Sequence, residues 1–215
     1  MAVCKDGKMG ELQKVSFGTK VAELVGDADV KAIAIGTKLY DASAMDLVIE
    51  ADTQIGNGVI TVYSSKCCMI HETEEVLLAE RKQSCGKCTF CREGLIQLHT
   101  MVKEITEGQG KKEFTDMMEE IGEAMTFSTP CTMGQTASDF AMGSLKYFAG
   151  EYEDHIKKKK CANNVCSAFM SIYIDPDLCE GCEECADVCP ADAIEGKSGY
   201  IHMIDEFECT KCGKC

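Results

Sequence analysis

Sixteen cysteines stand among the 215 residues, and most of them lie in closely spaced groups. The first group, Cys85, Cys88 and Cys91, has two residues between neighbouring cysteines. Three thiolates at this spacing can reach three irons of one cuboidal cluster, and the fourth ligand must come from elsewhere in the fold. Cys131, directly after Pro130, is the expected fourth ligand. Because structural zinc usually takes two separated C-x2-C pairs, the triplet predicts a 4Fe–4S cluster.

Two more cysteine groups lie near the end of the sequence. Residues 179–190 read Cys-Glu-Gly-Cys-Glu-Glu-Cys-Ala-Asp-Val-Cys-Pro, which is the bacterial ferredoxin pattern C-x2-C-x2-C-x3-C-P. Residues 209–215 repeat the triplet. In two-cluster ferredoxins the fourth cysteine of each run ligates the cluster of the other run. One 4Fe–4S cluster is therefore expected on Cys189, Cys209, Cys212 and Cys215.

The other cluster of this pair has three cysteines in the sequence, Cys179, Cys182 and Cys185, because the second Cys-Pro would lie beyond residue 215. The cluster motifs thus hold eleven cysteines, one short of what three clusters need. There are three explanations: the sequence is cut short, the site holds a three-iron or labile cluster, or another group is the fourth ligand. The regularity of the two halves favours a chain cut before its last cysteine.

A histidine and two cysteines follow within a short span: His155, Cys161 and Cys166. Together with Cys67 or Cys68 they would form a closed Cys3His site of the kind that holds structural zinc. Such a site could pin the linker that leads to the last cysteine groups. The alternative is that both cysteines are ordinary buried thiols and that His155 is a surface residue of a helix.

Charge and hydropathy exclude several classes of protein. The net charge is −14, and residues 171–215 hold 11 acidic and 3 basic side chains, so −8 lies in this segment. This balance argues against nucleic-acid binding, which needs a basic face. No stretch of 18 uncharged apolar residues and no secretory signal is visible, so we expect no membrane span and a cytoplasmic location. Clustered cysteines in such a chain indicate metal or redox chemistry rather than disulfides.

The elements that must position these cysteines divide the chain into three segments. Residues 11–66 are typical of a small α+β domain, residues 71–160 of helices, and residues 161–215 of short strands and cysteine loops in two related halves. Strands are expected at 15–17, 32–35, 59–63, 172–174 and 200–204. Helices are expected at 19–25, 74–82, 92–107, 113–127, 136–160 and 191–194.

No sequence motif points to catalysis by the chain alone. There is no G-x-G-x-x-G and no P-loop, so a nucleotide or flavin held by a glycine-rich loop is not expected. Lone histidines, without a Ser-His-Asp set or paired carboxylates, supply no nucleophile or general base. The chain is therefore expected to be no enzyme on its own.

Several stretches resemble a known family: Gly56-Asn-Gly-Val-Ile-Thr-Val, Cys68-Met69, residues 84–94, residues 131–137, and Tyr147-Phe148 with Glu151-Tyr152. From about residue 11 to 160 the chain resembles the C-terminal half of the flavin-carrying NADH dehydrogenase subunit of complex I. The remainder resembles the β subunit of electron-bifurcating FeFe-hydrogenases. Two departures stand out: the FMN- and NADH-binding half is not in the sequence, and Phe90 replaces the usual proline of the cysteine loop.

The resemblance implies an α+β multi-domain architecture. It comprises a ubiquitin-like soluble-ligand-binding β-grasp domain (1–70), a four-helix 4Fe–4S bundle (71–160), a linker with a zinc site (161–170) and a two-cluster ferredoxin domain (171–215). In the hydrogenase family the matching histidine and cysteines hold zinc, which implies a zinc site of Cys68, His155, Cys161 and Cys166.

Together these features predict an iron–sulfur electron-relay subunit of an anaerobic, flavin- and NAD(P)H-linked oxidoreductase complex, which could be electron-bifurcating. Its cofactors would be three 4Fe–4S clusters and one zinc ion, with no flavin in this chain. The expected partners are flavoprotein subunits that carry FMN or FAD and the NAD(P)H site, and a ferredoxin, hydrogenase or other reductase subunit. The alternative is a free-standing, soluble ferredoxin-like electron carrier.

Overall fold

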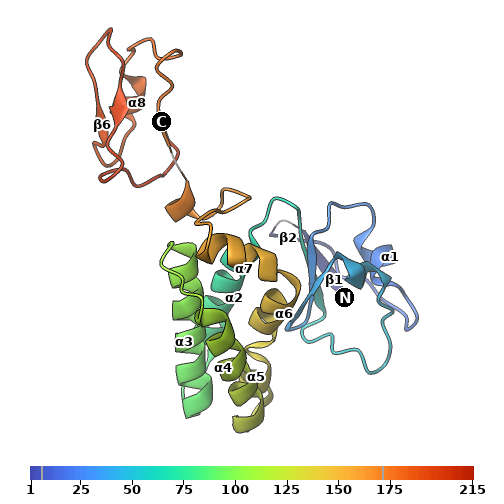
Figure 1. Ribbon diagram of the computed structural model, residues 1–215. Coiled ribbons are helices and arrows are strands. Elements are labelled where there is room, and N and C mark those ends of the chain that lie inside the picture. Colours follow the sequence, from blue (N-terminus) through green and yellow to red (C-terminus); the bar gives the residue numbers. More distant parts are fainter. Residues whose placement is uncertain (6, 171) are drawn as a thin grey trace. The chain divides into compact units, whose positions relative to one another are not determined.

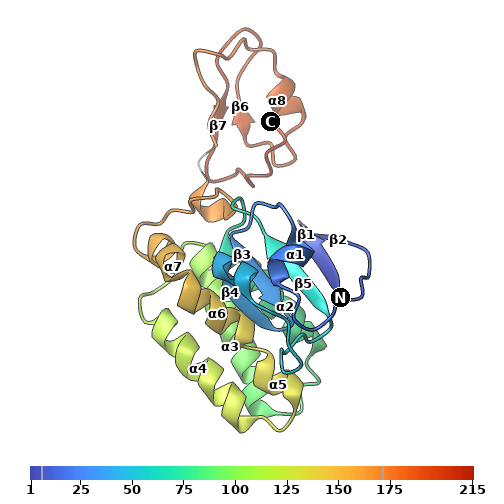
Figure 2. The same ribbon diagram turned by 90° about the vertical axis from the view of Figure 1, so that its right-hand side faces the viewer.

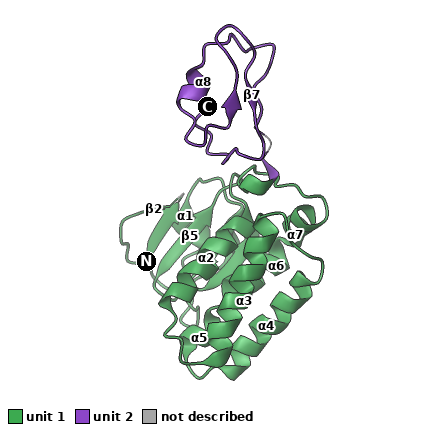
Figure 3. Cartoon of the chain, turned by 90° about the vertical axis from the view of Figure 1, so that its left-hand side faces the viewer, with its two compact units in different colours: residues 1–168 green, residues 169–215 purple. Residues whose placement is uncertain are grey.

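The computed structural model describes residues 1–5, 7–170 and 172–215, which form two compact units (Figure 3). The N-terminal unit, Met1–Ala168, joins a mixed β-sheet to a group of helices, and the C-terminal unit, Phe169–Cys215, holds the last cysteine groups. Residue 171, the predicted first residue of the ferredoxin domain, lies outside the described residues.

The sheet of the N-terminal unit has the strand order β2-β1-β5-β3-β4 (Figure 2). Strand β5 at the centre is parallel to its neighbour β1, and every other neighbouring pair is antiparallel. The elements are β1 (Ala2–Lys5), β2 (Lys8–Met9), α1 (Val21–Val25), β3 (Ala32–Ile35), β4 (Lys38–Asp41), the 3-10 helix η1 (Ala42–Asp46) and β5 (Val59–Tyr63).

Both faces of the sheet are covered, which explains why all four residues of β3 are buried. Ile33 and Ile35 face a core that contains Val21 and Val25 of α1. Ala32 and Ala34 face the opposite side, in an apolar cluster that also receives side chains from the helices. Because successive side chains of β3 point to opposite faces of the sheet, this one strand contributes to two separate apolar cores.

Six helices follow the sheet in the N-terminal unit (Figure 2). They are α2 (Met69–Gln83), α3 (Thr89–Thr106), α4 (Phe114–Ser128), α5 (Thr132–Thr136), α6 (Asp139–Tyr147) and α7 (Ala149–Ile156). Leu95, Leu98, Val102 and Ile105 recur at three- and four-residue spacing on α3, and all four are fully buried, so they form one apolar stripe. On α4 Met118 and Met125 are fully buried, whereas Met117 is 46% exposed.

Helix α6 packs directly on strand β4. A side chain at Gly143 would collide with the backbone of Leu39, so glycine allows the helix to approach the strand. Two side-chain contacts flank this crossing: Thr37 donates a hydrogen bond of 2.9 Å to Asp139, and the rings of Tyr63 and Phe140 meet edge to face at 5.9 Å. The sheet and the helices therefore share a packed interface.

The predicted helix and strand boundaries need three corrections in this unit. No strand forms at 15–17, and the sheet instead uses β1, β2 and β4, which the sequence did not reveal. The single helix expected at 136–160 is broken into α6 and α7. The break falls at Phe148, whose backbone leaves the helical conformation and whose ring packs against the apolar cluster of the sheet. Gly150 adds a residue of low helix propensity.

The C-terminal unit is built on a short antiparallel ribbon of β6 (Ile194–Glu195) and β7 (Met203–Ile204), with Ile194 opposite Ile204. It also contains the helix α8 (Glu184–Asp187), and the 3-10 turn η2 (Ser167–Phe169) lies at its start. The predicted strand at 172–174 is absent, and the predicted strand at 200–204 shortens to β7. The helix expected at 191–194 is also wrong, because Asp192 has a left-handed backbone and Ile194 starts β6.

Candidate metal centres

The four bundle cysteines, defined as Cys85, Cys88, Cys91 and Cys131, lie at one end of the helices. Helix α2 ends just before Cys85, and α3 begins just after Cys88. Helix α4 returns antiparallel to α3 and ends just before Cys131, at the same end of the bundle (Figure 1). Helix α5, which begins after Cys131, contacts α3. The fold thus brings the distant fourth cysteine to the end of the helices where the triplet lies.

The loop that carries the triplet is shaped by its own hydrogen bonds. Gly86 has a left-handed backbone with φ of 71°, and its carbonyl accepts a bond of 2.8 Å from Arg92. The hydroxyl of Ser84 lies 3.4 Å from the Cys91 sulfur. Cys88 directly precedes the first turn of α3. These contacts fix the conformation of the segment that carries the triplet.

The two cysteine triplets of the C-terminal unit share one backbone pattern. In the first, Gly181 and Glu183 have left-handed backbones, with φ of 72° and 66°. In the second, Lys211 and Gly213 do the same at the matching positions, with φ of 52° and 68°. A left-handed residue thus stands directly before and directly after the middle cysteine of each triplet, a backbone conformation that turns the chain tightly. The predicted relation between the two halves thus extends to backbone conformation.

One cavity gathers the cysteines that the sequence assigns to the second triplet's cluster. Its lining includes Cys189, Cys209, Cys212 and Cys215, together with Ile194 and Ile204 from the ribbon. The sulfur of Cys189 accepts a hydrogen bond from the backbone N–H of Ala193, and that of Cys209 accepts one from Lys211, both at 3.4 Å. A hydrogen bond from the Lys214 backbone lowers the pKa of Cys212. The donor set therefore fits a four-thiolate cluster.

The first triplet lies against the turn that precedes β7. The backbone N–H of Gly199 donates a hydrogen bond of 3.0 Å to the carbonyl of Gly181. Burial raises the pKa of the Cys185 thiol, and the neighbouring Cys182 and Cys179 raise it further, as expected for sulfurs close together. The sequence assigns no fourth ligand to this group, and none is identified among the described residues.

The sequence analysis missed one buried residue of this unit. His202 lies two residues before Ile204, on the inner face of the ribbon, and packs against Gly196. Its side chain is 2% exposed, and its Nε2 atom has no hydrogen-bond partner among the residues that the structure describes. A single histidine just before a short strand gives no signal by spacing, so only the fold could reveal its burial.

The Cys3His site, defined as Cys68, His155, Cys161 and Cys166, is fully assembled. All four side chains are buried, and their ligand atoms lie within 4.8 Å of one another. The Sγ atoms of Cys68 and Cys166 are 3.8 Å apart, and each lies 3.4 Å from Nε2 of His155. In residues 1–5, 7–170 and 172–215, this is the one group of three or more such side chains with that spacing.

The spacing of the Cys3His site fits a single tetrahedral ion. Bonds of about 2.3 Å to sulfur and about 2.0 Å to nitrogen would place two sulfurs about 3.8 Å apart and a sulfur and a nitrogen about 3.5 Å apart. Both expectations agree with the distances found between Cys68, Cys166 and His155. Of the two cysteines considered from sequence, Cys68 joins the site, whereas Cys67 lies beside Ser64, with 3.9 Å between sulfur and hydroxyl.

The pKa shifts in the Cys3His site reflect how closely its groups share protons. The hydrogen bond from Cys166, and then that from His155, lower the pKa of Cys68 to about 3, while the first of these bonds raises the pKa of Cys166. Burial opposes protonation of His155, but its contact with the Cys68 thiolate raises its pKa to about 9. The Nδ1–H of His155 donates a bond of 2.8 Å to the carbonyl of Glu151, which turns Nε2 toward the sulfurs.

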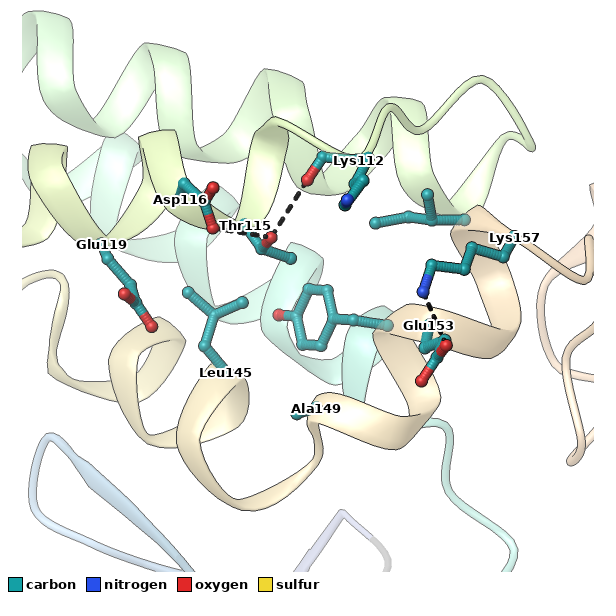
Figure 4. A pocket seen from close by; sticks show the side chains of 10 residues that line it. Lys112, Thr115, Asp116, Glu119, Leu145, Ala149, Glu153 and Lys157 are labelled. Atoms are coloured by element: carbon teal, nitrogen blue, oxygen red, sulfur yellow. Dashed lines mark hydrogen bonds and ion pairs between the residues drawn. The ribbon is translucent and has the colours of Figure 1, made fainter.

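A pocket without cysteines lies between α4 and the pair α6 and α7 (Figure 4). Its lining combines apolar side chains such as Leu145 and Ala149 with charged ones such as Asp116 and Lys157. Lys157 pairs with Glu153 at 2.7 Å across one turn of α7. None of the motifs singled out in the sequence contributes a cysteine or histidine to this pocket.

The fold and its cysteine groups define the class of protein. Residues 72–155 match the NADH-ubiquinone oxidoreductase-F iron–sulfur binding region, and residues 172–195 match a 4Fe–4S binding domain. The chain therefore contains two regions of the 4Fe–4S-binding type, and the resemblance to NADH dehydrogenase-type subunits is confirmed.

Particular relatives are oxidoreductase subunits. The NADP-reducing hydrogenase subunit HndC of Solidesulfovibrio fructosivorans is 35% identical over 148 residues, which are 69% of this chain and 30% of that protein. An NADH-quinone oxidoreductase subunit of Streptomyces coelicolor is 30% identical over 111 residues, which are 52% of this chain and 25% of that protein. The chain thus spans less than a third of the length of these relatives.

A solved structure shares the fold. The crystal structure of NAD+-reducing NiFe-hydrogenase in the air-oxidized state matches with a TM-score of 0.66 at 17% identity, over 73% of this chain and 30% of that chain. Among the helices of the described residues, none combines the length and apolar character needed to cross a bilayer.

Proposed function

We propose that this chain is an electron-relay part of a flavin- and NAD(P)H-linked oxidoreductase complex. It would pass single electrons between a flavin on a partner protein and a ferredoxin or another redox centre. The relatives support this role, since their names describe NADH-quinone oxidoreductase and NADP-reducing hydrogenase subunits. Electron bifurcation, a cytoplasmic location and the absence of catalysis by the chain alone belong to the same proposal.

The observation that carries the proposal is the matched pair of cysteine loops in the C-terminal unit. Both triplets repeat the same left-handed positions, and Cys189 joins the second triplet around one cavity. Four thiolates around one small cavity are the ligand set of a cubane cluster. A second, independent ligand set at the end of the helical bundle gives the chain more than one centre, as a relay requires.

Each cysteine group receives a role in this proposal. One 4Fe–4S cluster is assigned to Cys85, Cys88, Cys91 and Cys131, a second to Cys189, Cys209, Cys212 and Cys215, and a third to Cys179, Cys182 and Cys185 with a further ligand. The Cys3His site is assigned a structural Zn²⁺, because it is closed and buried and offers no open position to a substrate.

The architecture around the clusters supports finer domain assignments. We assign residues 1–70 to a β-grasp domain of the soluble-ligand-binding type. The support is a mixed sheet of order β2-β1-β5-β3-β4, in which β1 and β5 are parallel and one short helix, α1, packs against the sheet. We assign residues 71–160 to the iron–sulfur bundle, 161–170 to the zinc-bearing linker and 171–215 to a two-cluster ferredoxin domain. The flavin and the NAD(P)H site are assigned to a partner flavoprotein.

The protein's own groups set how readily electrons enter and leave. When bound, the clusters accept and donate one electron at a time, whereas a nicotinamide transfers two at once. Backbone N–H groups of Ala193 and Lys211 donate to the ligand sulfurs, which stabilises added negative charge. The acidic side chains of residues 171–215 act in the opposite direction and lower the potential. They would also steer a basic docking surface of the partner.

The experiment that tests the proposal is iron and acid-labile sulfide analysis with EPR of the reduced chain, purified without oxygen. We expect three spin-coupled 4Fe–4S clusters and about one zinc ion per chain. A three-iron signal would mean that the site of Cys179, Cys182 and Cys185 lacks a fourth ligand. A colourless chain without iron would refute the relay. Rapid electron donation by an isolated monomer to several acceptors would instead support the free carrier.

A further inference from the structure

One lysine of the sheet contacts all three chain segments that supply the ligands of the Cys3His site. Lys31 directly precedes β3, and its ammonium lies 2.6 Å from the carbonyl of Cys67, 2.7 Å from a carboxylate oxygen of Glu151 and 3.3 Å from the side-chain oxygen of Asn163. Cys67 precedes Cys68, Glu151 lies one helical turn before His155, and Asn163 lies between Cys161 and Cys166.

Glu151 carries the effect of Lys31 toward the histidine. One carboxylate oxygen pairs with Lys31, and the other accepts a hydrogen bond of 3.0 Å from the backbone N–H of Met69, at the start of α2. The backbone carbonyl of the same residue accepts the Nδ1–H of His155. Glu151 thus fixes both the helix that follows Cys68 and the orientation of the imidazole.

Asn163 fixes the third segment in the same manner. Its side-chain oxygen accepts a hydrogen bond from Lys31, and its side-chain nitrogen donates one of 2.6 Å to the carbonyl of Ser65. Ser65 is held in turn by Asp29, which accepts a backbone hydrogen bond of 3.0 Å. Both Asp29 and Lys31 lie in the short segment before β3, so the sheet holds the turn ahead of Cys68 at two points.

We propose that Lys31, acting with Glu151, is a positioning residue for the Cys3His site, so that metal binding is coupled to the packing of the sheet on the helices. This inference rests on the proposed metal role of that site. Lys31 and Glu151 are not metal ligands themselves, because their polar atoms bond to each other and to other groups of the protein. Both are about four-fifths buried, with side-chain exposures of 18% and 19%, so their ion pair is poorly screened by solvent.

The physical reason is preorganisation. The ligands come from three separate segments, and a metal ion that binds a loose site must first order them. Lys31 makes one contact with each segment, so these contacts order the segments before the ion arrives. Loss of outer contacts that orient ligands typically lowers metal affinity about 10- to 100-fold. A lysine that merely stabilised the fold would affect the empty and the occupied protein equally and leave the affinity unchanged.

The test measures zinc affinity of the whole chain by competition with a chromophoric chelator. The variant Lys31→Met removes all three contacts and should weaken zinc binding about 10- to 100-fold. Lys158→Met is the matched control, because Lys158 forms an exposed ion pair with Asp154 on the helix that carries His155. The control should stay within about twofold of the parent. Cobalt(II) gives a second readout, since a disordered site would lose the intense bands of tetrahedral thiolate coordination.

A second variant protects the test against a folding failure. Glu151→Gln keeps an oxygen for the Met69 N–H and the carbonyl for His155, but removes the charge opposite Lys31. It should weaken zinc binding in the same direction by a smaller factor. Affinities of both variants within about twofold of the parent would overturn the positioning role while leaving the metal site intact. A parent chain that binds neither zinc nor cobalt would refute the metal site itself.

Discussion

The left-handed glycines of the C-terminal unit allow a sharp test of how the cysteine loops are held. Gly181 has φ of 72°, and a β-carbon added there would lie 2.7 Å from the backbone nitrogen of Tyr200 and 2.8 Å from two backbone atoms of Gly199. Gly213 has nearly the same backbone, with φ of 68°, but nothing lies within 4 Å of its β-carbon position. The two positions therefore differ in the room for a β-carbon, whereas the backbone strain of an alanine would be nearly the same.

The magnitude follows from this difference. Alanine in a left-handed conformation costs about 1 kcal/mol at either position. Gly181→Ala adds about 1–3 kcal/mol, because the atoms that must move are backbone. The excess of about 2 kcal/mol corresponds to a factor of about 30 in the population of the opened loop.

The assay is the release of iron to a coloured chelator under native conditions, without oxygen. Where opening precedes release, the rate follows the opened population. Gly181→Ala should therefore lose the iron of one cluster about 30 times faster than Gly213→Ala. Equal release rates for the two variants would refute the packing of the Gly181 loop against residues 199 and 200.

Three other changes have defined outcomes. Cys189→Ser should remove or convert one cluster of the chain, which is measured as iron content and EPR intensity, whereas Cys4→Ser in strand β1 should change neither. Equal iron in the two variants would contradict the assignment of Cys189 to the cluster of the second triplet. Ser144→Ala removes a partner of the buried Tyr152 hydroxyl, 3.2 Å away, and should lower the free energy of unfolding by about 1 kcal/mol in denaturant titrations. Chelation of zinc should lower the unfolding temperature of the N-terminal unit by several degrees in calorimetry without loss of iron; an unchanged temperature would argue against a structural ion.

The cysteine groups were predictable because their information lies in local spacing. The distance along the chain between Cys85, Cys88 and Cys91 dictates a tight loop, whatever packs around it. The bundle stripe of Leu95, Leu98 and neighbouring residues was equally readable, since burial repeats with the helical period.

The remaining features depend on contacts between distant segments. Strand β1 forms by pairing with β5, more than fifty residues later, and its own short sequence carries no alternation that predicts it. The break at Phe148 depends on the sheet cluster that receives the ring. Lys31 was invisible for the same reason, because a lysine before a strand resembles any solvated charge until the fold places three acceptors around it.

The contacts of Lys31 also determine where the chain can be divided for study. A fragment that starts at the first residue of α2 would contain every bundle cysteine and His155, Cys161 and Cys166. It would lack Cys68 and the lysine that holds the three ligand segments. A piece that keeps the Cys3His site together with Lys31 therefore begins upstream of β3, so the sheet must be produced together with the helices.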